Sequence, residues 1–265
     1  MTWIIFATVF VAGLLLGSFL NVVIYRGPAL WGLGDSESRS RGDFIAPRSY
    51  CPSCGKQIRA VDLVPVVSYV VLGGKCRDCK ARIPLRYPIV ELLGGAAGLL
   101  SVAVYGPTID AGLAALFLFT LIALAFIDRE TGYLPDALTL PLAAAGLAAN
   151  ITGRFASIGA ALIGAAAGFL AFWALAAAYR ALRGREGLGG GDAKLLAALG
   201  AWGGWTMLAP TVFAASVLAL AFVGIGAIAG RRIDRTTSVR FGPALCAAGA
   251  AVFIAAALGA PSFVP

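Results

Sequence analysis

Long runs of apolar residues, separated by short polar connections, dominate the chain. Eight such runs each predict a helix, at residues 2–25, 87–106, 111–127, 137–151, 156–179, 193–209, 211–230 and 241–260. A helix needs about 20 residues to cross a bilayer, and several of these runs are shorter. Periodicity does not assign their faces, because Ala and Gly dominate and both sides of a membrane helix are apolar. We expect an all-α integral membrane protein with about eight transmembrane helices.

The charged residues are few and unevenly distributed. Of 265 residues, 60% are hydrophobic and only 13% are charged, against roughly 25% charged in a soluble domain. Basic residues favour the cytoplasmic side of short membrane loops. All but one of the 21 Lys and Arg lie on alternate connections, Arg154 being the exception. Both termini are therefore expected outside, and the pI of about 9.6 reflects topology and contact with the lipid bilayer, with no nucleic-acid partner.

Residues 26–86 form the one long polar segment and hold four of the five cysteines. These cysteines form two CxxC pairs with 21 residues between the inner members, at Cys51, Cys54, Cys76 and Cys79. That spacing is typical of a zinc ribbon, and a chain without histidine can supply tetrahedral ligands only as thiolates. A cytoplasmic location argues against disulfides, and no βαβ pattern indicates a redox pair. We expect a small cytoplasmic loop domain with a structural zinc site, and inert packing for Cys246.

The absence of histidine excludes Ser-His-Asp and Cys-His catalysis and the HExxH metalloproteases. Acid–base chemistry is then left to carboxylates and lysine. Seven of the 13 acids are expected in water: Asp35, Glu37, Asp43, Asp62, Asp78, Asp110 and Asp234. The other six lie at the cytoplasmic ends of predicted membrane helices, where an acid is costly and is a functional candidate by default. They are Glu91, Asp128, Glu130, Asp136, Glu186 and Asp192.

Two of these acids, Asp128 and Asp192, can face each other across the bundle. Asp128 follows the apolar run 121–127, and Asp192 follows the glycines of GLGGGDAK. Two close carboxylates share one proton, so one acts as a base toward water while the other polarises a carbonyl. The glycines would let backbone or substrate approach the acid.

Simpler roles compete at each of these positions. Asp192 and Asp136 each sit where a helix N-cap is expected. Glu130 and Glu186 lie beside arginines and are expected to be solvated. Glu91, about one turn inside its helix, could bind a substrate amine or extend its carboxylate to the cytoplasm.

Six ordered blocks carry a resemblance to a known family. They are GSFLNVVIYR at 17–26, CPSCG at 51–55, the segment 64–93, IDRETGYLPDALTLPL at 127–142, GLGGGDAKLLAALGAWGGW at 187–205 and FGPAL at 241–245. Together they resemble the type IV prepilin peptidases, which are membrane aspartic proteases with a Gly-x-Gly-Asp motif. The resemblance implies that Asp128 and Asp192 are the catalytic pair. Gly189, Gly191, Lys194 and Glu91 are expected to support this site.

The same resemblance implies the substrate and the cofactors. Prepilins of type IV pili and pseudopilins of type II secretion would lose a short basic leader at the cytoplasmic face of the bacterial inner membrane. Members with the four-cysteine loop also methylate the new N-terminus with S-adenosylmethionine. The implied organisation is a first transmembrane helix at 1–25, a cytoplasmic zinc-binding domain at 26–86 and a seven-helix peptidase domain at 87–265.

Two other functions compete with this interpretation. A presenilin-like Gly-x-Gly-Asp protease would carry a Tyr-Asp motif, whereas Asp128 follows Ile127. A small transporter could use the acids as a proton relay, but such proteins commonly show internal repeats, and none is visible in this chain.

Overall fold

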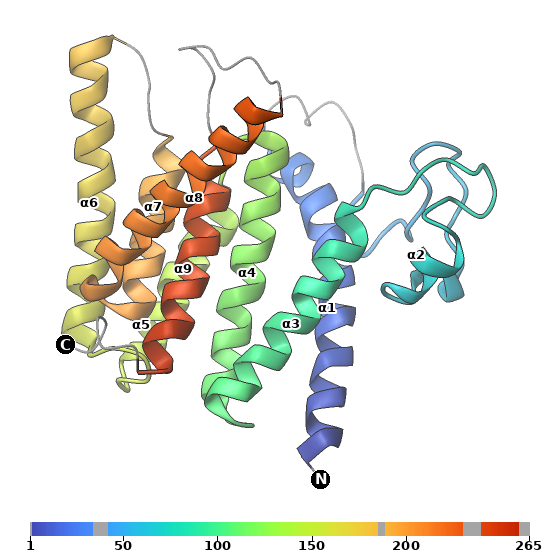
Figure 1. The fold of residues 1–265 in the computed structure, drawn as a ribbon, viewed down its shortest axis with the longest axis horizontal. Coiled ribbons are helices and arrows are strands. Elements are labelled where there is room, and N and C mark those ends of the chain that lie inside the picture. The colour runs from blue at the N-terminus through green and yellow to red at the C-terminus, as the bar shows by residue number, and fades with distance from the viewer. Residues whose placement is uncertain (1, 34–41, 185–188, 230–239, 260–265) are drawn as a thin grey trace. The chain divides into compact units, whose positions relative to one another are not determined.

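The computed structural model describes residues 2–33, 42–184, 189–229 and 240–259. Within these ranges the chain is helical and has no extended strand, only two isolated bridges. The long helices are α1 (Thr2–Leu30), α3 (Arg86–Tyr105), α4 (Ile109–Thr131), α5 (Asp136–Asn150), α6 (Ile158–Arg183), α7 (Gly190–Gly203), α8 (Leu208–Ile228) and α9 (Gly242–Ala257). Each of the eight predicted apolar runs is thus helical, and the predicted all-α class is confirmed (Figure 1).

Five helices in the described residues are long and apolar enough to cross a bilayer: α1, α3, α4, α6 and α8. Helices α5, α7 and α9 have 15, 14 and 16 residues, fewer than the roughly 20 that span the hydrocarbon core. The predicted helix 193–209 was too long at its C-terminal end. It stops at Gly203 because Gly204 has a φ of +76°, which residues with a side chain rarely adopt. A 3₁₀ turn at Trp205–Met207 then leads into α8.

The chain divides into two compact units, Met1–Ala123 and Leu124–Pro265. In the first unit, α1 and α3 lie side by side (Figure 1). A β-carbon added to Gly13 would lie 2.5 Å from the carbonyl oxygen of Gly94, and one added to Gly17 would lie 2.8 Å from the Cα of Glu91. Small residues at a membrane-helix interface let the two backbones approach closely, so that van der Waals packing holds them together.

Helix α7 is the most buried element of the second unit and packs against α5 and α6. Gly164 and Gly168 of α6 face the backbone of α7, where an added β-carbon would meet Gly200 and Leu196. Trp202 is fully buried and its indole N–H donates to the Leu142 carbonyl at 2.8 Å. This packing fixes the axis of α7, and with it the position of the residues at its N-terminus.

A buried amide binds the C-terminal end of the same helix. Asn150, at the end of α5, donates from Nδ2 to the carbonyl oxygens of Ala201 and Trp202, both at 2.9 Å, and its Oδ1 accepts from the amides of Phe155 and Ala156 at 3.0 Å. The last carbonyls of a helix have no partner inside the helix, so Asn150 satisfies two of these groups in α7 and anchors the loop that enters α6.

Candidate functional site

Asp128 lies in the last turn of α4, directly after the buried apolar run that the sequence pattern marked. Its side chain is buried, with 6% of the residue exposed. The Oδ2 atom has no hydrogen-bond partner among the described residues. Burying a carboxylate oxygen without a hydrogen-bond partner costs free energy. Such a cost at this position indicates that the oxygen binds a water molecule or a substrate.

Asp192 lies in the first turn of α7 and is buried to a similar degree, at 9% exposed. The N-cap of α7 is Gly189, which has no side chain of its own to cap the helix. Asp192 is instead the third residue of the helix, so the N-cap interpretation considered from the sequence is wrong for this residue. Its carboxylate interacts electrostatically with that of Asp128, and both interact with the buried thiol of Cys246 on α9. The two acids therefore belong to one site within the second unit.

The glycines before Asp192 allow close packing. A β-carbon on Gly191 would lie 2.8 Å from the Cβ of Leu134, and one on Gly189 would lie 3.5 Å from the Oδ2 of Asp192. A real β-carbon almost never comes within 3 Å of another heavy atom. Gly191 thus lets the loop after α4 contact the start of α7, while Gly189 leaves space beside the carboxylate.

Sequence reasoning missed the contribution of α9 to this site. The segment FGPAL contributed to the resemblance but received no role. Gly242 begins α9 and its backbone amide interacts with the Asp128 carboxylate. Just before it, the Arg240 guanidinium donates to the carbonyl oxygen of Arg129. The only signal in the sequence was the Gly-Pro pair at a helix start, which is typical of an N-terminus and does not name the partner.

Lys194 and Asp136 form an ion pair that the sequence did not predict. The Lys194 Nζ lies 2.6 Å and 2.7 Å from the two carboxylate oxygens of Asp136, and the pair joins α7 to α5. The predicted N-cap role of Asp136 is wrong, because Pro135 is the N-cap residue and Asp136 already lies inside α5. This ion pair thus links α5 to the N-terminal part of α7.

Glu91 lies in the first unit, on α3, and is buried at 8% exposed. Its Oε2 accepts a hydrogen bond from the backbone amide of Val66 at 2.7 Å. Val66 has a φ of +61°, which is costly for a β-branched residue, so the carboxylate stabilises a strained turn before the short helix α2 (Val67–Val71). The proposed extension of Glu91 into water is wrong, since the side chain points into protein.

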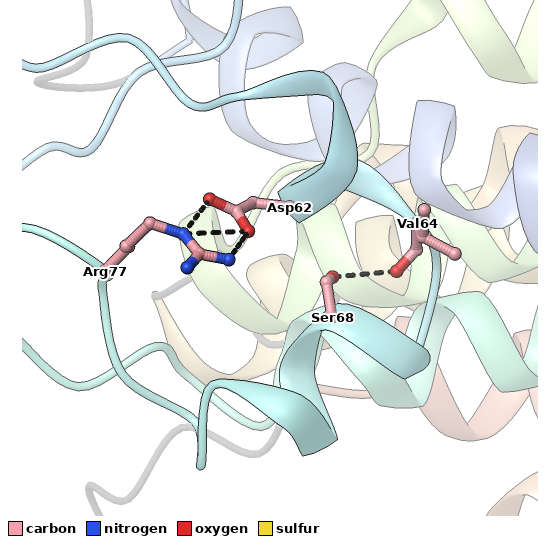
Figure 2. Close-up of polar contacts among 4 residues, drawn as sticks. All are labelled: Asp62, Val64, Ser68 and Arg77. Carbon is pink, nitrogen blue, oxygen red and sulfur yellow. Dashed lines mark hydrogen bonds and ion pairs between the residues drawn. The ribbon is translucent and has the colours of Figure 1, made fainter.

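The other acids behave in different ways. Glu130 is exposed, as expected. Asp62 was expected in water, but its side chain is only 8% exposed and it pairs with Arg77 (Figure 2). Asp35, Glu37, Glu186 and Asp234 lie outside the described residues.

The four cysteines of the first unit come together as the sequence predicts. Their Sγ atoms all lie within 4.8 Å of one another, and those of Cys51 and Cys79 are 3.8 Å apart. Each CxxC pair forms the same tight turn, in which the amide of Cys51 donates to Lys56 and that of Cys76 donates to Ala81. Four converging thiol groups are soft ligands that could hold a metal ion.

Electrostatic contacts support this arrangement. Burial raises the pKa of Cys51, but hydrogen bonds from the amides of Cys54 and Ser53 outweigh it, and the net pKa is about 7. A lowered pKa favours the thiolate, which is the form that binds metal. At Cys79 the hydrogen bond from the Ala81 amide is outweighed by burial and by hydrogen bonds with the other three thiol groups, which raise its pKa to about 11. The two turns are joined by an ion pair of 3.0 Å between Lys56 and Asp78.

A second ion pair ties the loop before α2 to the second turn. The Arg77 guanidinium donates to both oxygens of Asp62, at 2.6 Å and 2.9 Å (Figure 2). The hydroxyl of Ser68 in α2 donates to the carbonyl of Val64, which precedes the helix (Figure 2). The hydrogen bonds from Arg77 lower the pKa of Asp62. This pair therefore stabilises the fold above about pH 4, and its contribution is lost as the pH falls through that lowered pKa.

The two CxxC turns have different residues directly after the second cysteine, Gly55 in one and Lys80 in the other. This difference tests whether the two turns require the same backbone conformation. Gly55 and Lys80 both have positive φ, +71° and +61°, a conformation that costs a residue with a side chain about 1 kcal/mol or more. We expect Lys80→Gly to raise the melting temperature and Gly55→Ala to lower it, each by the equivalent of about 1 kcal/mol. Thermal unfolding of the purified protein measures both. Shifts of the same sign would contradict the equivalence of the turns.

Comparison with known proteins connects the two units to one family. Residues 11–105 match the model of the bacterial peptidase A24 N-terminal domain, and residues 115–224 match that of the type IV leader peptidase family. A protein of Burkholderia pseudomallei (strain 1026b), named prepilin leader peptidase/N-methyltransferase, is 46% identical over 91% of this chain and 82% of its own length. The chain belongs to the type IV leader peptidase family.

Other members of the type IV leader peptidase family with the same name are similar over nearly the whole chain. The relative from Aeromonas hydrophila is 46% identical over 93% of this chain and 89% of its own length. The relative from Pseudomonas aeruginosa is 43% identical over 89% of this chain and 86% of its own length. No solved structure matches the chain. The resemblance inferred from the six sequence blocks is confirmed.

Proposed function

We propose that this multi-pass membrane protein is a prepilin leader peptidase that also methylates the N-terminus it creates. Its substrates are prepilins and pseudopilins, from which it removes the basic leader. The observation that carries this proposal is the pair of buried carboxylates, Asp128 and Asp192, brought together in a chain of the type IV leader peptidase family.

The chemistry needs only these two carboxylates and water. With one proton between them, the ionised aspartate takes a proton from a water molecule, and the resulting hydroxide adds to the scissile carbonyl carbon. The protonated aspartate donates its proton to the carbonyl oxygen. When the tetrahedral intermediate collapses, the C–N bond breaks and the leaving amine takes up a proton. Burial favours this division of roles, because two charged carboxylates in a poorly solvated site repel each other strongly.

Physical properties of the substrate fit the position of the pair. Asp128 lies at the end of a membrane-spanning helix, next to a connection that the basic residues assign to the cytoplasm. An apolar pilin helix can enter the bilayer while its basic leader stays near anionic lipid at the surface. The bond between leader and helix then reaches the depth of the two acids. We place the enzyme in the bacterial inner membrane with this site and the cysteine turns facing the cytoplasm.

The metal of the four-cysteine site is zinc in this proposal. Tetrahedral zinc with Zn–S bonds of about 2.3 Å has sulfur atoms about 3.8 Å apart, which agrees with the 3.8 Å between Cys51 and Cys79. Cys51, Cys54, Cys76 and Cys79 would hold the ion, which leaves no open position for catalysis, so zinc would only join the two turns.

The methyl group would come from S-adenosylmethionine, whose sulfonium carries a transferable methyl group. In that transfer the new N-terminal amine would form a bond to the methyl carbon while the carbon–sulfur bond breaks, and S-adenosylhomocysteine and a proton would be released. The relatives in the three bacteria named above carry the name N-methyltransferase, and that name supports the second activity.

Purified protein in proteoliposomes tests the function. We expect an added prepilin to lose its leader and, with S-adenosylmethionine present, to gain one methyl group on the new amine. A prepilin that remains intact with well-folded protein would overturn the proposal. Accumulation of a solute in the same vesicles would instead favour the transporter.

A further inference from the structure

Gly242 has no room for a side chain because it lies against Asp128. A β-carbon added to Gly242 would lie 2.5 Å from the Oδ2 of Asp128, 2.9 Å from its Cγ and 3.3 Å from its Cβ. Contacts under 3 Å are essentially never seen for real β-carbons. Both residues are buried, so neither can easily move toward solvent to relieve such a contact. Only glycine at this position lets α9 begin against the carboxylate.

The groups around the Asp128 carboxylate come from three elements. From the start of α9, the Gly242 amide interacts with it favourably, and the positive charge of Arg240 acts on it. From α7 it faces the carboxylate of Asp192, and one turn further along α9 lies the thiol of Cys246. A helix N-terminus and a basic side chain both favour a negative charge, while the second carboxylate opposes it.

Packing, more than hydrogen bonding, holds the side chain of Asp128 in place. Its Oδ2 has no hydrogen-bond partner within the described part of the chain, which leaves that oxygen available to a water molecule or a substrate. A carboxylate held by few hydrogen bonds depends on close neighbours to fix its rotamer. Of the described glycines, Gly242 is the one at which an added β-carbon would come closest to the Asp128 carboxylate.

We propose that Gly242 is a positioning residue of the peptidase site, whose missing side chain leaves the Asp128 carboxylate in place against the start of α9. This inference rests on the proposed function of the aspartate pair. Gly242 acts only through the Asp128 carboxylate that it contacts. Its effect comes from the absence of a side chain and from its backbone amide.

The test compares Gly242→Ala with Gly224→Ala. Gly224 lies on α8 of the same unit, and a β-carbon there meets nothing within 4 Å, so its variant controls for a Gly-to-Ala change in a helix. We expect Gly242→Ala to lower kcat for prepilin cleavage by about 100-fold, the typical cost of a misplacement of about 1 Å. KM should change by less than about threefold, since uniform binding is unaffected. Gly224→Ala should keep wild-type kinetics.

Folded-protein concentration, measured by thermal unfolding, separates positioning from a general loss of structure. Gly242→Ala should remain slow per folded molecule at the assay temperature, with KM near that of the wild type. A variant with wild-type kcat per folded molecule, or with KM raised as much as kcat falls, would overturn the proposal.

A double-mutant cycle gives a readout that needs no activity. Asp128→Ala removes the carboxylate that an alanine at position 242 would meet. Gly242→Ala should therefore lower the melting temperature clearly in the wild type and much less in the Asp128→Ala background. Equal shifts in both backgrounds would contradict the contact. This cycle also applies if Gly242→Ala folds poorly alone. A wild type that does not cleave prepilin would refute the proposed function, while the cycle would still report on the contact.

Discussion

Replacing either aspartate by asparagine is expected to abolish prepilin cleavage. Asparagine keeps the shape of the side chain but can neither accept the proton of water nor donate one to a carbonyl. The loss of general acid–base catalysis alone is worth about 10² to 10⁴ in rate, and the two acids act as a unit, so Asp128→Asn and Asp192→Asn should be equally inactive. Initial rates of cleavage in lipid, measured beside thermal unfolding, give the comparison.

Glu130→Gln is the matched control for this experiment. Glu130 lies two residues after Asp128 on the same helix but is exposed, so the same chemical change there should leave the cleavage rate within about twofold of wild type, because substitutions at exposed positions usually have small effects. Rates near wild type for Asp128→Asn or Asp192→Asn, from folded protein, would remove these residues from the mechanism.

The second large effect is expected from loss of a cysteine ligand. Cys54→Ser should release the zinc proposed for this site, since a structural zinc site typically gains about 10–16 kcal/mol on metal binding and folds with the metal. The cysteines lie in the first compact unit and the aspartate pair in the second. Loss of the metal should disturb the first unit more than the second, which holds the aspartate pair. We therefore expect methylation of an already cleaved pilin to fall at least about tenfold, and cleavage of the prepilin to fall less.

Three measurements check this expectation on one preparation: metal content by elemental analysis, methyl transfer to the cleaved pilin, and cleavage of the prepilin. Ser53→Ala is the control, because the exposed Ser53 side chain lies between the same two cysteines and the change leaves all four thiols in place. Equal loss of both activities from a well-folded Cys54→Ser variant would count against a separate role for the cysteine site.

The elements of this protein could be predicted from local sequence properties. Apolar runs predicted the helices, because a lipid-exposed backbone has to satisfy its hydrogen bonds internally. The CxxC spacing predicted the thiol cluster, since each pair forms its own turn. The acids of the candidate site stood out because carboxylates at membrane depth are costly.

The contacts between helices could not be predicted in the same way. The pairing of Lys194 with Asp136, the approach of Gly242 to Asp128, and the bond from Val66 to Glu91 each join segments distant in sequence. Capping propensity suggested a local role for Asp136 and Asp192, but tertiary packing placed both inside their helices. Helix α7 ends at Gly203 and is followed by Gly204. This Gly-Gly pair lies within an apolar run, so the hydrophobic pattern did not indicate that the helix ends there.

The most direct test of the central claim is mass spectrometry of one prepilin after incubation with the wild type and, in parallel, with Asp192→Asn. The account predicts that the wild type alone yields two products, a free basic leader and a pilin that begins with its apolar segment. An intact prepilin with both proteins, or the same two products with both, would contradict an aspartic peptidase built on Asp128 and Asp192.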